Sequence, residues 1–508
     1  MHFLTSNGIT SVAVDTVAVI FLTLLTVASF FAFVYFLCKY ADDKSPMRRR
    51  KTVLAVTLVS GFVLRIVFGM CIRGYRESYS VFTDMFAALR VNGLDGYYTG
   101  DSSTVLYPIV YFVYLIFGGL SNIMGLSDFE LGAQFMVKLP LIGADLLIAY
   151  AVYKLAQKYT GEKTGAVLCA FVCGCPVFFM GSVIWTTRVV FTAMFAVWFC
   201  YFLARKKYGL AIGFATLAAF SSKEGIYLFP VAAVFSVYHL VRAIMNVKAD
   251  GVRGRAVTDG KYSAVYEVPC AFVLSVLGAY LVGLFMTASY SYNIFKYIYE
   301  FTIRPLVGWT NFTYNGLSVY ALFNQNGQET GVRFPSWVFA CIFAAIALAV
   351  VCVVYFSKRN RATMVMLAAY SLVTLSVYFP GSGAETMTVA FATLLGAYAL
   401  VRDKRLLYVL FVLGIVYIVN GLSVLASAGY LNNVSDFVFT DGGYTGSTLL
   451  SGGLSAICIT CSALAVAAHL YFTVITVNIG MTGQKRLLEP QSGLKASLKE
   501  FFAVRKPV

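Results

Sequence analysis

The sequence predicts an all-α integral membrane protein, a bundle of about 13 transmembrane helices. Hydrophobic residues make up 59% of the chain and charged residues only 12%, and the mean hydropathy is +0.78, which excludes a soluble globular protein. Apolar runs of about 17–25 residues recur along nearly the whole chain, the length that a helix needs to cross ~30 Å of hydrocarbon. The alternating segments of about ten residues that build outer-membrane barrels are absent, so the runs indicate helices.

The charge distribution indicates the partner of the chain. The net charge is +16, but most of the excess lies in short loops and in the C-terminal tail, where the positive-inside rule places Lys and Arg. No basic stripe with interleaved aromatic residues points to nucleic acid, so we expect the lipid bilayer as partner and no nucleic acid. With only three histidines in the chain, we expect neither a metal nor another cofactor.

The first two apolar runs set the orientation. The run at about 12–38 has no Lys or Arg before it, whereas Lys39 and the 48–51 cluster follow it. The N-terminus is therefore expected outside and the cluster in the cytoplasm. The second run, at about 52–72, then ends outside. It carries Arg65 near its middle, which is costly in lipid unless the side chain faces the bundle interior.

The segment 107–125 has two interpretations. It is apolar enough to cross the membrane, but the next run, at about 135–153, ends in Lys154, Lys158 and Lys163, which belong inside. Two crossings in succession would leave these lysines outside. We therefore expect 107–125 to be a peripheral or shallow re-entrant helix, part of an outer loop that carries juxtamembrane helices.

From there the runs alternate between the two sides. They are expected at about 163–185, 189–204, 208–222, 226–240, 268–287, 337–356, on both sides of an outer hairpin at 381–385, at 406–426 and at 457–475. The protein is thus expected in the cell membrane with its C-terminus in the cytoplasm and its large polar loops, with any chemistry, outside. We divide the chain into an extra N-terminal helix with a basic loop, a core module, C-terminal helices and a basic tail, at 1–50, 51–400, 401–480 and 481–508.

Four stretches carry polar residues in a recognisable order and spacing. They are Thr83-Asp84-Met85 with Tyr107-Pro108-Ile109, Lys138-Leu139-Pro140 with Ala144-Asp145-Leu146, Ser222-Lys223-Glu224 before Phe229-Pro230-Val231, and the segment from Asn315 to Leu322. Together they resemble the GT-C class of membrane glycosyltransferases, and within it bacterial relatives of the PIG-V-type mannosyltransferases of GPI-anchor synthesis. The resemblance covers about residues 52–400.

The resemblance implies a GT-C-like bundle that transfers a hexose, mannose in this family, from a polyprenyl-phosphate carrier to an extracytoplasmic glycan, lipid or protein, with inversion. Because the leaving phosphate is a weak base, one carboxylate suffices to take the proton of the acceptor hydroxyl, and Asp84 is the implied base. Cations at the outer interface suit the donor phosphate, namely Lys223, Lys296, Arg304, Arg333 and Arg188. The implied contacts to sugar or acceptor are Tyr107, Glu224, Asn315 and Glu385.

The chain departs from the family pattern at three points. Arg188 stands where relatives carry an acid, Leu106 replaces the acid before Tyr107, and only Glu385 remains of a His-Glu-Arg-like step. A non-catalytic relative that still binds a lipid-linked sugar therefore stays open as an alternative.

The residues themselves also allow a structural role for Asp84 and a transport role for the chain. Asp84 has the sequence context of a helix N-cap, in which case it only caps the helix that follows. A transporter or flippase of a lipid-linked saccharide would also be a many-helix membrane protein, and it predicts inverted repeats and broken helices near the midplane. Inside the bundle, Lys138 is expected to form an ion pair with Asp145.

Overall fold

We describe the protein from a computed structural model of its 508 residues. The description covers residues 24–37, 50–71, 76–92, 107–126, 131–250, 262–287, 312–328, 336–357, 361–427 and 455–482, with Phe295 and Leu450. The predicted cytoplasmic tail lies almost wholly outside these ranges.

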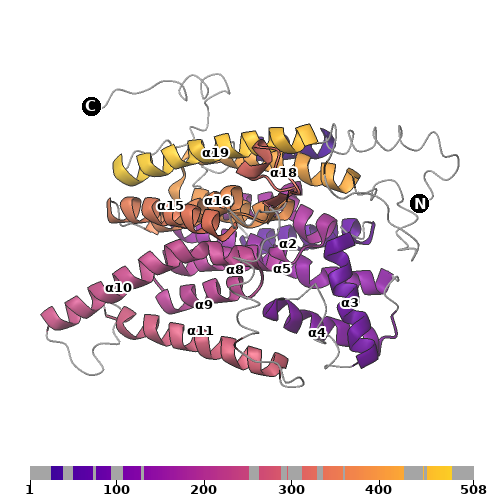
Figure 1. Ribbon diagram of the computed structural model, residues 1–508, viewed down its shortest axis with the longest axis horizontal. Helices are drawn as coiled ribbons and strands as arrows, with labels where there is room; N and C mark the ends of the chain where they lie inside the picture. Colours follow the sequence, from indigo (N-terminus) through magenta and orange to yellow (C-terminus); the bar gives the residue numbers. More distant parts are fainter. Residues whose placement is uncertain are drawn as a thin grey trace.

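The described residues are helical almost throughout (Figure 1). The helices are Leu24–Leu37, α2 (Arg50–Cys71), α3 (Arg76–Asn92), α4 (Pro108–Ile123), α5 (Leu131–Tyr159), α6 (Glu162–Gly174), α7 (Pro176–Phe179), η2 (Met180–Trp185), α8 (Val189–Ala204), α9 (Tyr208–Ala219), η3 (Lys223–Leu228), α10 (Phe229–Ala249), α11 (Ala264–Thr287), α14 (Val319–Leu322), α15 (Ser336–Ser357), α16 (Arg361–Tyr378), η5 (Ala384–Thr386), α17 (Met387–Val401), α18 (Lys404–Ser427) and α19 (Ser455–Thr482). Two short strands, β1 (Thr313–Tyr314) and β2 (Ser382–Gly383), pair in parallel.

Helices occupy the positions of all predicted spans, but only some are long enough to cross a membrane. Eight described helices have the length and apolar composition of a span, or nine if the bent pair Glu162–Gly174 and Pro176–Trp185 counts as one. The other predicted spans correspond to shorter apolar helices, namely Leu24–Leu37, α8, α9 and α16. An all-α protein with several helices fit for a membrane is therefore confirmed, whereas the predicted number of about 13 spans is not.

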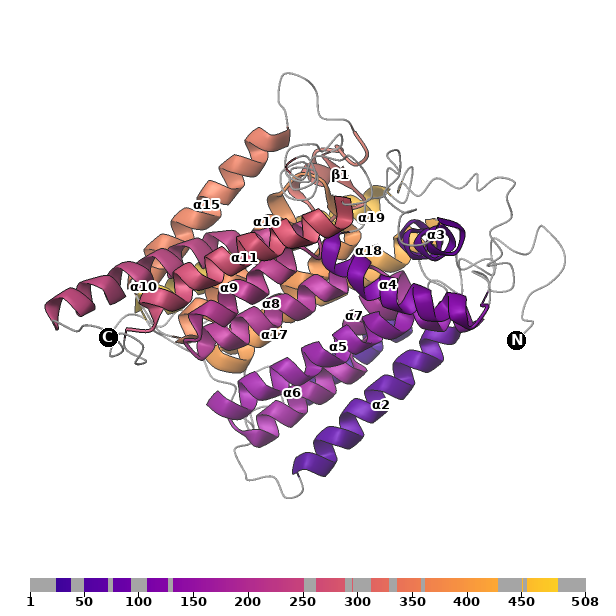
Figure 2. The same ribbon diagram turned by 90° about the horizontal axis from the view of Figure 1, so that it is seen from below.

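The long helices lie side by side, and α3 and α4 cross them. In Figure 2, α3 is seen nearly end-on and α4 runs across the direction of α2 and α5. α4 also belongs to the apolar helices that are too short to count as spans. The peripheral or shallow re-entrant position expected for 107–125 stays a prediction.

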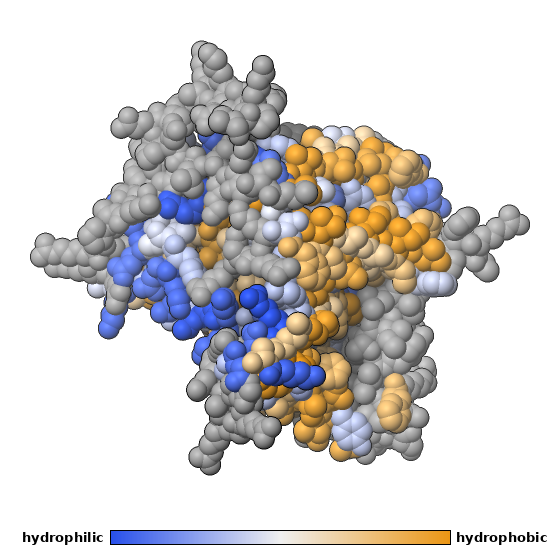
Figure 3. Space-filling view, turned by 90° about the vertical axis from the view of Figure 1, so that its left-hand side faces the viewer, coloured by the Kyte–Doolittle hydropathy of each residue, from blue (hydrophilic) through white to orange (hydrophobic). Residues whose placement is uncertain are grey.

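The helices differ greatly in burial. In α17, 89% of the most apolar stretch is buried inside the protein, whereas only 11% of the corresponding stretch of α11 and 22% of that of α15 are buried. α17 is therefore a central helix, and α11 and α15 turn apolar side chains outward, as helices in contact with lipid do. Figure 3 shows such hydrophobic surface beside a hydrophilic region on one face of the molecule.

One end of the bundle is basic. The hydroxyl of Tyr159 donates a hydrogen bond to the backbone oxygen of Ala204 over 2.8 Å, and Leu155 lies against Gly396, so the C-terminal ends of α5, α8 and α17 lie together. The basic residues at these helix ends are Lys158, Arg205, Lys206, Lys207, Arg402 and Lys404. The ends of these three helices therefore form one basic end of the bundle.

Two predictions concern buried charges inside the bundle, and the structure agrees with the first and contradicts the second. Arg65 is 0% exposed and its Nε donates to Oδ2 of Asp145 over 2.8 Å, so it faces the interior as predicted. The predicted pair between Lys138 and Asp145 is wrong, because Lys138 donates instead to the backbone oxygen of Val183 over 2.7 Å. The forked guanidinium of Arg65 serves Asp145 and backbone carbonyls at once, which a lysine ammonium at this position does not do as well.

Candidate functional site

The turn between α9 and α10 presents a lysine and a glutamate. η3 begins at Lys223 and leads directly into α10. Gly225 makes this close turn possible, because a Cβ there would lie 2.1 Å from the backbone oxygen of Ala218. Glu224 is 1% exposed and the side chain of Lys223 is 12% exposed. The turn therefore holds two opposite charges largely away from solvent.

A two-stranded pairing brings a distant loop to this turn. In the register of β1 and β2, Thr313 lies opposite Ser382. Gly316 allows the close approach, because a Cβ there would lie 2.2 Å from the backbone oxygen of Ser382. Asn315, with a left-handed φ of 54°, bridges to Gly383. The segment 312–328 is thereby fastened to the loop that carries Glu385.

The β2 loop contacts the α9–α10 turn directly. The Nζ of Lys223 donates a hydrogen bond to the backbone oxygen of Gly381, and the hydroxyl of Thr386 donates to Oε1 of Glu224 over 3.4 Å. Glu385 is half-buried between these contacts and interacts electrostatically with Lys223 and Glu224. The adjacent residues Lys223 and Glu224 therefore lie close to Glu385, which is distant in the sequence.

Arg188 reaches the same place from the end of a π-helix. η2 ends at Trp185, and the next residue, Thr186, has a left-handed φ of 57° at which the chain turns into α8. The guanidinium carbon of Arg188 lies 5.1 Å from the ring centre of Tyr107, a cation–π contact. The backbone N–H of Ile109 donates to the oxygen of Phe220 over 3.2 Å, which ties the start of α4 to the α9–α10 turn.

We call Tyr107, Arg188, Lys223, Glu224 and Glu385 the polar cluster. Lys223 interacts electrostatically with Glu224, Glu385 and Arg188. Two cations thus balance two carboxylates at a largely buried place, so their mutual attraction offsets part of the cost of removing them from water. Burial raises the pKa of the Tyr107 hydroxyl and so favours its protonated form, which is able to donate a hydrogen bond.

The polar cluster has the groups that phosphate binding and proton transfer require. Arg188 and Lys223 supply charged N–H donors for phosphate oxygens, and a carboxylate such as Glu385 is able to take a proton from a hydroxyl. Across the described ranges, no group of three or more His, Cys, Asp or Glu side chains is placed to hold a metal ion.

Five of the predicted site residues thus come together as the polar cluster. Asn315 is next to the cluster, but its Oδ1 accepts hydrogen bonds from the backbone of Leu450 (2.9 Å) and from Asn326 (3.1 Å), and its backbone oxygen accepts one from Asn420 (2.8 Å). These bonds favour a role in holding the loop. Three predicted phosphate ligands lie outside the described residues, namely Lys296, Arg304 and Arg333.

Asp84 lies in the middle of α3. α3 begins at Arg76, eight residues before Asp84, so the N-cap interpretation is wrong. The helix starts earlier because Tyr79, Phe82 and Phe86 continue one buried apolar face that packs on α4. Asp84 is exposed on the opposite side of α3. Its predicted role as base stays a prediction.

Tyr227 is a neighbour of the cluster that sequence reasoning missed. It is 1% exposed and interacts electrostatically with Glu224 and Tyr107, and its hydroxyl has no hydrogen-bond partner among the described residues. In the same part of the structure, Oδ1 of Asn420 and the hydroxyl of Ser318 are also buried without a partner. Such groups normally have partners, so they point to room for water or a polar ligand. Nothing in the spacing of the 34 tyrosines singles out Tyr227.

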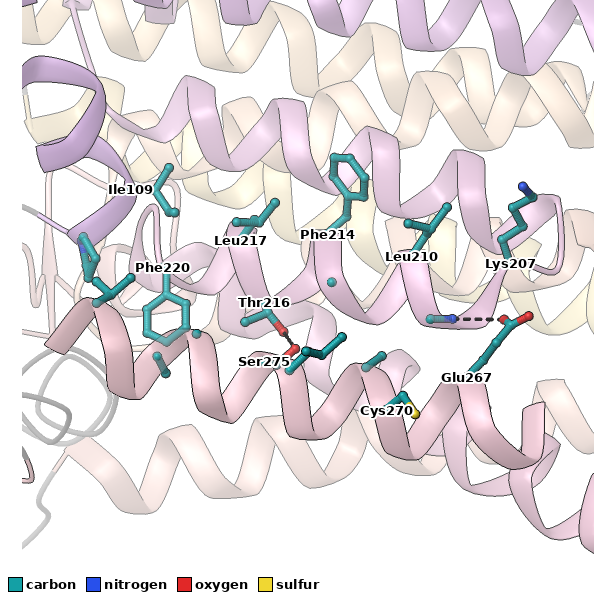
Figure 4. A pocket seen from close by; sticks show the side chains of 18 of the residues that line it. Ile109, Lys207, Leu210, Phe214, Thr216, Leu217, Phe220, Glu267, Cys270 and Ser275 are labelled. Carbon is teal, nitrogen blue, oxygen red and sulfur yellow. Dashed lines mark hydrogen bonds between the residues drawn. The ribbon is translucent and has the colours of Figure 1, made fainter. Parts of the chain in front are cut away.

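An apolar groove lies between α9 and α11 (Figure 4). Its volume is about 740 Å³. At one end it is lined by Ile109 and Phe220, which adjoin the cluster, and at the other by Lys207 and Glu267. Its walls are mostly apolar side chains, among them Leu210, Phe214, Leu217, Leu274 and Val282. The groove therefore offers a path for a hydrocarbon chain along the outside of the bundle.

Comparison with the models of known protein families finds no match for this chain, and neither does comparison with curated proteins. The function therefore has to be inferred from the chemistry of the site.

Proposed function

We propose that the protein is a membrane glycosyltransferase that moves a hexose from a polyprenyl-phosphate carrier to an acceptor hydroxyl outside the cell membrane. The observation that carries the proposal is the convergence of the polar cluster. Tyr107, Arg188, Lys223, Glu224 and Glu385 come from four separate parts of the chain, and the sequence alone predicts each of them as a site residue.

Charge and position suggest a role for each group. Arg188 and Lys223 bind the phosphate of the donor, because they are the cations of the cluster. The protonated hydroxyl of Tyr107 and the carboxylate of Glu224 hydrogen-bond to sugar hydroxyls. Mannose is the first sugar to test, because it is the sugar of the family that the sequence resembles.

The groove between α9 and α11 supports a lipid-linked donor. Ile109 and Phe220 at its end lie next to the polar cluster, so a phosphate held by the cluster leaves its hydrocarbon tail at the mouth of the groove. α11 is largely exposed along its apolar stretch, which gives a lipid sideways access from the bilayer.

The proposed reaction needs only one carboxylate, which acts as the base. The oxygen of the acceptor hydroxyl bonds to the anomeric carbon while the bond from that carbon to the phosphate oxygen breaks, and polyprenyl phosphate leaves with the electron pair. The carboxylate takes the proton of the hydroxyl, and attack from the face opposite to the leaving group inverts the configuration. The resemblance assigns the proton to Asp84, and the polar cluster offers Glu385 as the competing base.

A pair of isosteric variants tests the proposal and separates the two bases. The purified protein is reconstituted in liposomes with radiolabelled polyprenyl-phosphate mannose or glucose and membranes of the source cells as acceptor. Loss of the base is expected to lower transfer by about 10²- to 10⁴-fold. If Asp84 is the base, Asp84→Asn lowers transfer by this full factor and Glu385→Gln, which removes one charge of the polar cluster, lowers it less; the reverse result assigns Glu385. Failure of the wild-type protein to form a glycosidic bond with either donor would contradict the proposal.

One feature of the fold favours transport as a second candidate function. The chain bends by 51° between Glu162–Gly174 and Pro176–Trp185, and the buried pair of Arg65 and Asp145 lies at this break. Broken helices and buried charges are common in transporters. A transporter moves a fluorescent lipid-linked saccharide across sealed vesicles without forming a glycosidic bond, so the two functions are separated by the product.

A further inference from the structure

At the break between α6 and α7, Arg65 donates hydrogen bonds to backbone carbonyl groups. Pro176 has no N–H, so the backbone oxygen of Val172 lacks its helical donor. The Nη2 of Arg65 donates to this oxygen over 3.0 Å, and its Nη1 donates to the oxygen of Cys173 over 2.7 Å. Arg65 on α2 therefore replaces the donors that the break removes.

Two further buried groups connect α5 to the π-helix. Oδ2 of Asp145 accepts hydrogen bonds from Nε of Arg65 (2.8 Å) and from the hydroxyl of Ser182 (2.7 Å). The Nζ of Lys138 donates to the backbone oxygen of Val183 over 2.7 Å. Each of the four polar side chains is at most 1% exposed. Both ends of the bonds to Ser182 and Val183 are thus shielded from water.

The π-helix leads directly to the polar cluster. The N–H of Thr187 donates to the oxygen of Gly181 over 2.9 Å, which closes a widened turn, and Arg188 is the next residue. The indole of Trp185 packs against Gly421 of α18, where a Cβ would lie 3.2 Å from its Nε1. The position of Arg188 over Tyr107 therefore depends on the conformation of η2.

We infer that Arg65, Asp145, Ser182 and Lys138 form a positioning network that holds η2 in its π-helical form and so directs Arg188 to the polar cluster. A π-helix is rare and is kept where surrounding contacts favour it. Buried charges contribute little net stability compared with apolar residues of the same size, so a specific placement is the better reason for them. The inference rests on the proposed function only in treating Arg188 as a ligand-binding residue.

Ser182→Ala is the sharpest variant, because it cuts the link from Asp145 to η2 and leaves the pair of Arg65 and Asp145 in place. Thr393→Ala is the matched control. Thr393 is equally buried, but its hydroxyl bonds only to backbone oxygens of its own helix α17. Both variants are made in a protein whose other three tryptophans are phenylalanine, so that fluorescence reports Trp185 alone.

In this background Ser182→Ala is expected to shift the emission of Trp185 and to increase its quenching by acrylamide, whereas Thr393→Ala leaves both unchanged. The same emission in both variants would overturn the inference. This readout needs no substrate, so it judges the network even if the proposed function fails.

A transfer assay with polyprenyl-phosphate mannose gives the second measurement. In the otherwise unchanged chain, Ser182→Ala is expected to raise KM for the donor about fivefold, the effect of one buried hydrogen bond, with a smaller change in kcat. Added to Arg188→Gln, it is expected to raise KM little further. A full additional fivefold increase in the double variant would show that the network does not act through Arg188 and would overturn the inference. If the wild-type protein transfers no sugar, the proposed function falls while the Trp185 result stands.

Discussion

Lys223 and Glu224 reach the polar cluster because Gly225 lets the chain turn against the end of α9. The backbone of Ala218 lies where a side chain at Gly225 would begin. A flexible side chain can move out of the way of a new methyl group, but helix backbone cannot do so cheaply.

Gly225→Ala is therefore expected to destabilise the protein by about 2–3 kcal/mol, because the added Cβ overlaps backbone atoms at 2.1 Å. Thermal unfolding in detergent measures the effect. Gly143→Ala is the control, since nothing lies within 4 Å of a Cβ there and alanine favours helix. Equal midpoints for the two variants would contradict this account of the turn.

Residue patterns are a good guide to the polar cluster and a poorer one to single roles. Lys223, Glu224 and Glu385 are charged residues at the predicted outer end, and the helices bring them together. Asp84 is expected near the head of a helix, yet α3 begins eight residues earlier. Asn315 is predicted to contact sugar or acceptor, and that role stays a prediction beside its bonds to Leu450 and Asn420. The sequence shows which residues are polar, whereas the packing of the helices decides which way each side chain faces.

At the scale of elements, the pair α9 and α11 forms the wall of the groove. A hydrogen bond between Thr216 and Ser275 (2.9 Å) joins the two helices at its floor. Gly213 and Gly278 line the groove, and nothing lies within 4 Å of a Cβ at either position. A large side chain there fills the groove without disturbing the packing of the helices.

Gly213→Leu and Gly278→Leu are expected to raise KM for a long-chain polyprenyl-phosphate sugar about tenfold, and to affect a short-chain analogue much less, because only the long tail needs the groove. Donor kinetics with both chain lengths measure this difference. Gly143→Leu, which adds the same side chain at another open position, controls for the loss of a helical glycine. An equal effect on long and short donors would place the tail elsewhere.

The break at Pro176 shows how elements depend on their neighbours. The apolar run at about 163–185 predicts one continuous span, but the helix bends there by 51°. Pro140 lies inside the continuous α5, and Pro269 inside α11. Proline alone therefore does not decide where a helix breaks. Near Pro176, the backbone oxygens of Val172 and Cys173 accept hydrogen bonds from Arg65, which belongs to another helix, α2.

At the scale of the whole molecule, the bundle has a basic end and a second end that carries the polar cluster. The positive-inside rule places the basic end in the cytoplasm, so the cluster and the 312–328 loop are expected outside. This orientation determines on which side of the membrane the proposed acceptor lies.

Labelling of whole cells with a membrane-impermeant maleimide tests the orientation. Gln328→Cys in the loop is expected to react in intact cells, because this exposed residue belongs to the end with the polar cluster. Lys206→Cys at the basic end is expected to react only after the membrane is permeabilised. The unsubstituted chain measures the background from its own 11 cysteines. Reaction of Lys206→Cys alone in intact cells would reverse the topology and exclude an outer active site.

The sequence by itself determined the all-α, strongly apolar character of the protein and the place of nearly every described helix, because hydropathy along a segment acts on that segment alone. Only the tertiary structure decided which spans are long enough, where α6 breaks and which polar residues meet. The bond between Lys223 and Gly381 joins residues 158 positions apart. Such a contact depends on how helices pack side by side, which neither the hydropathy nor the charge of a single segment specifies.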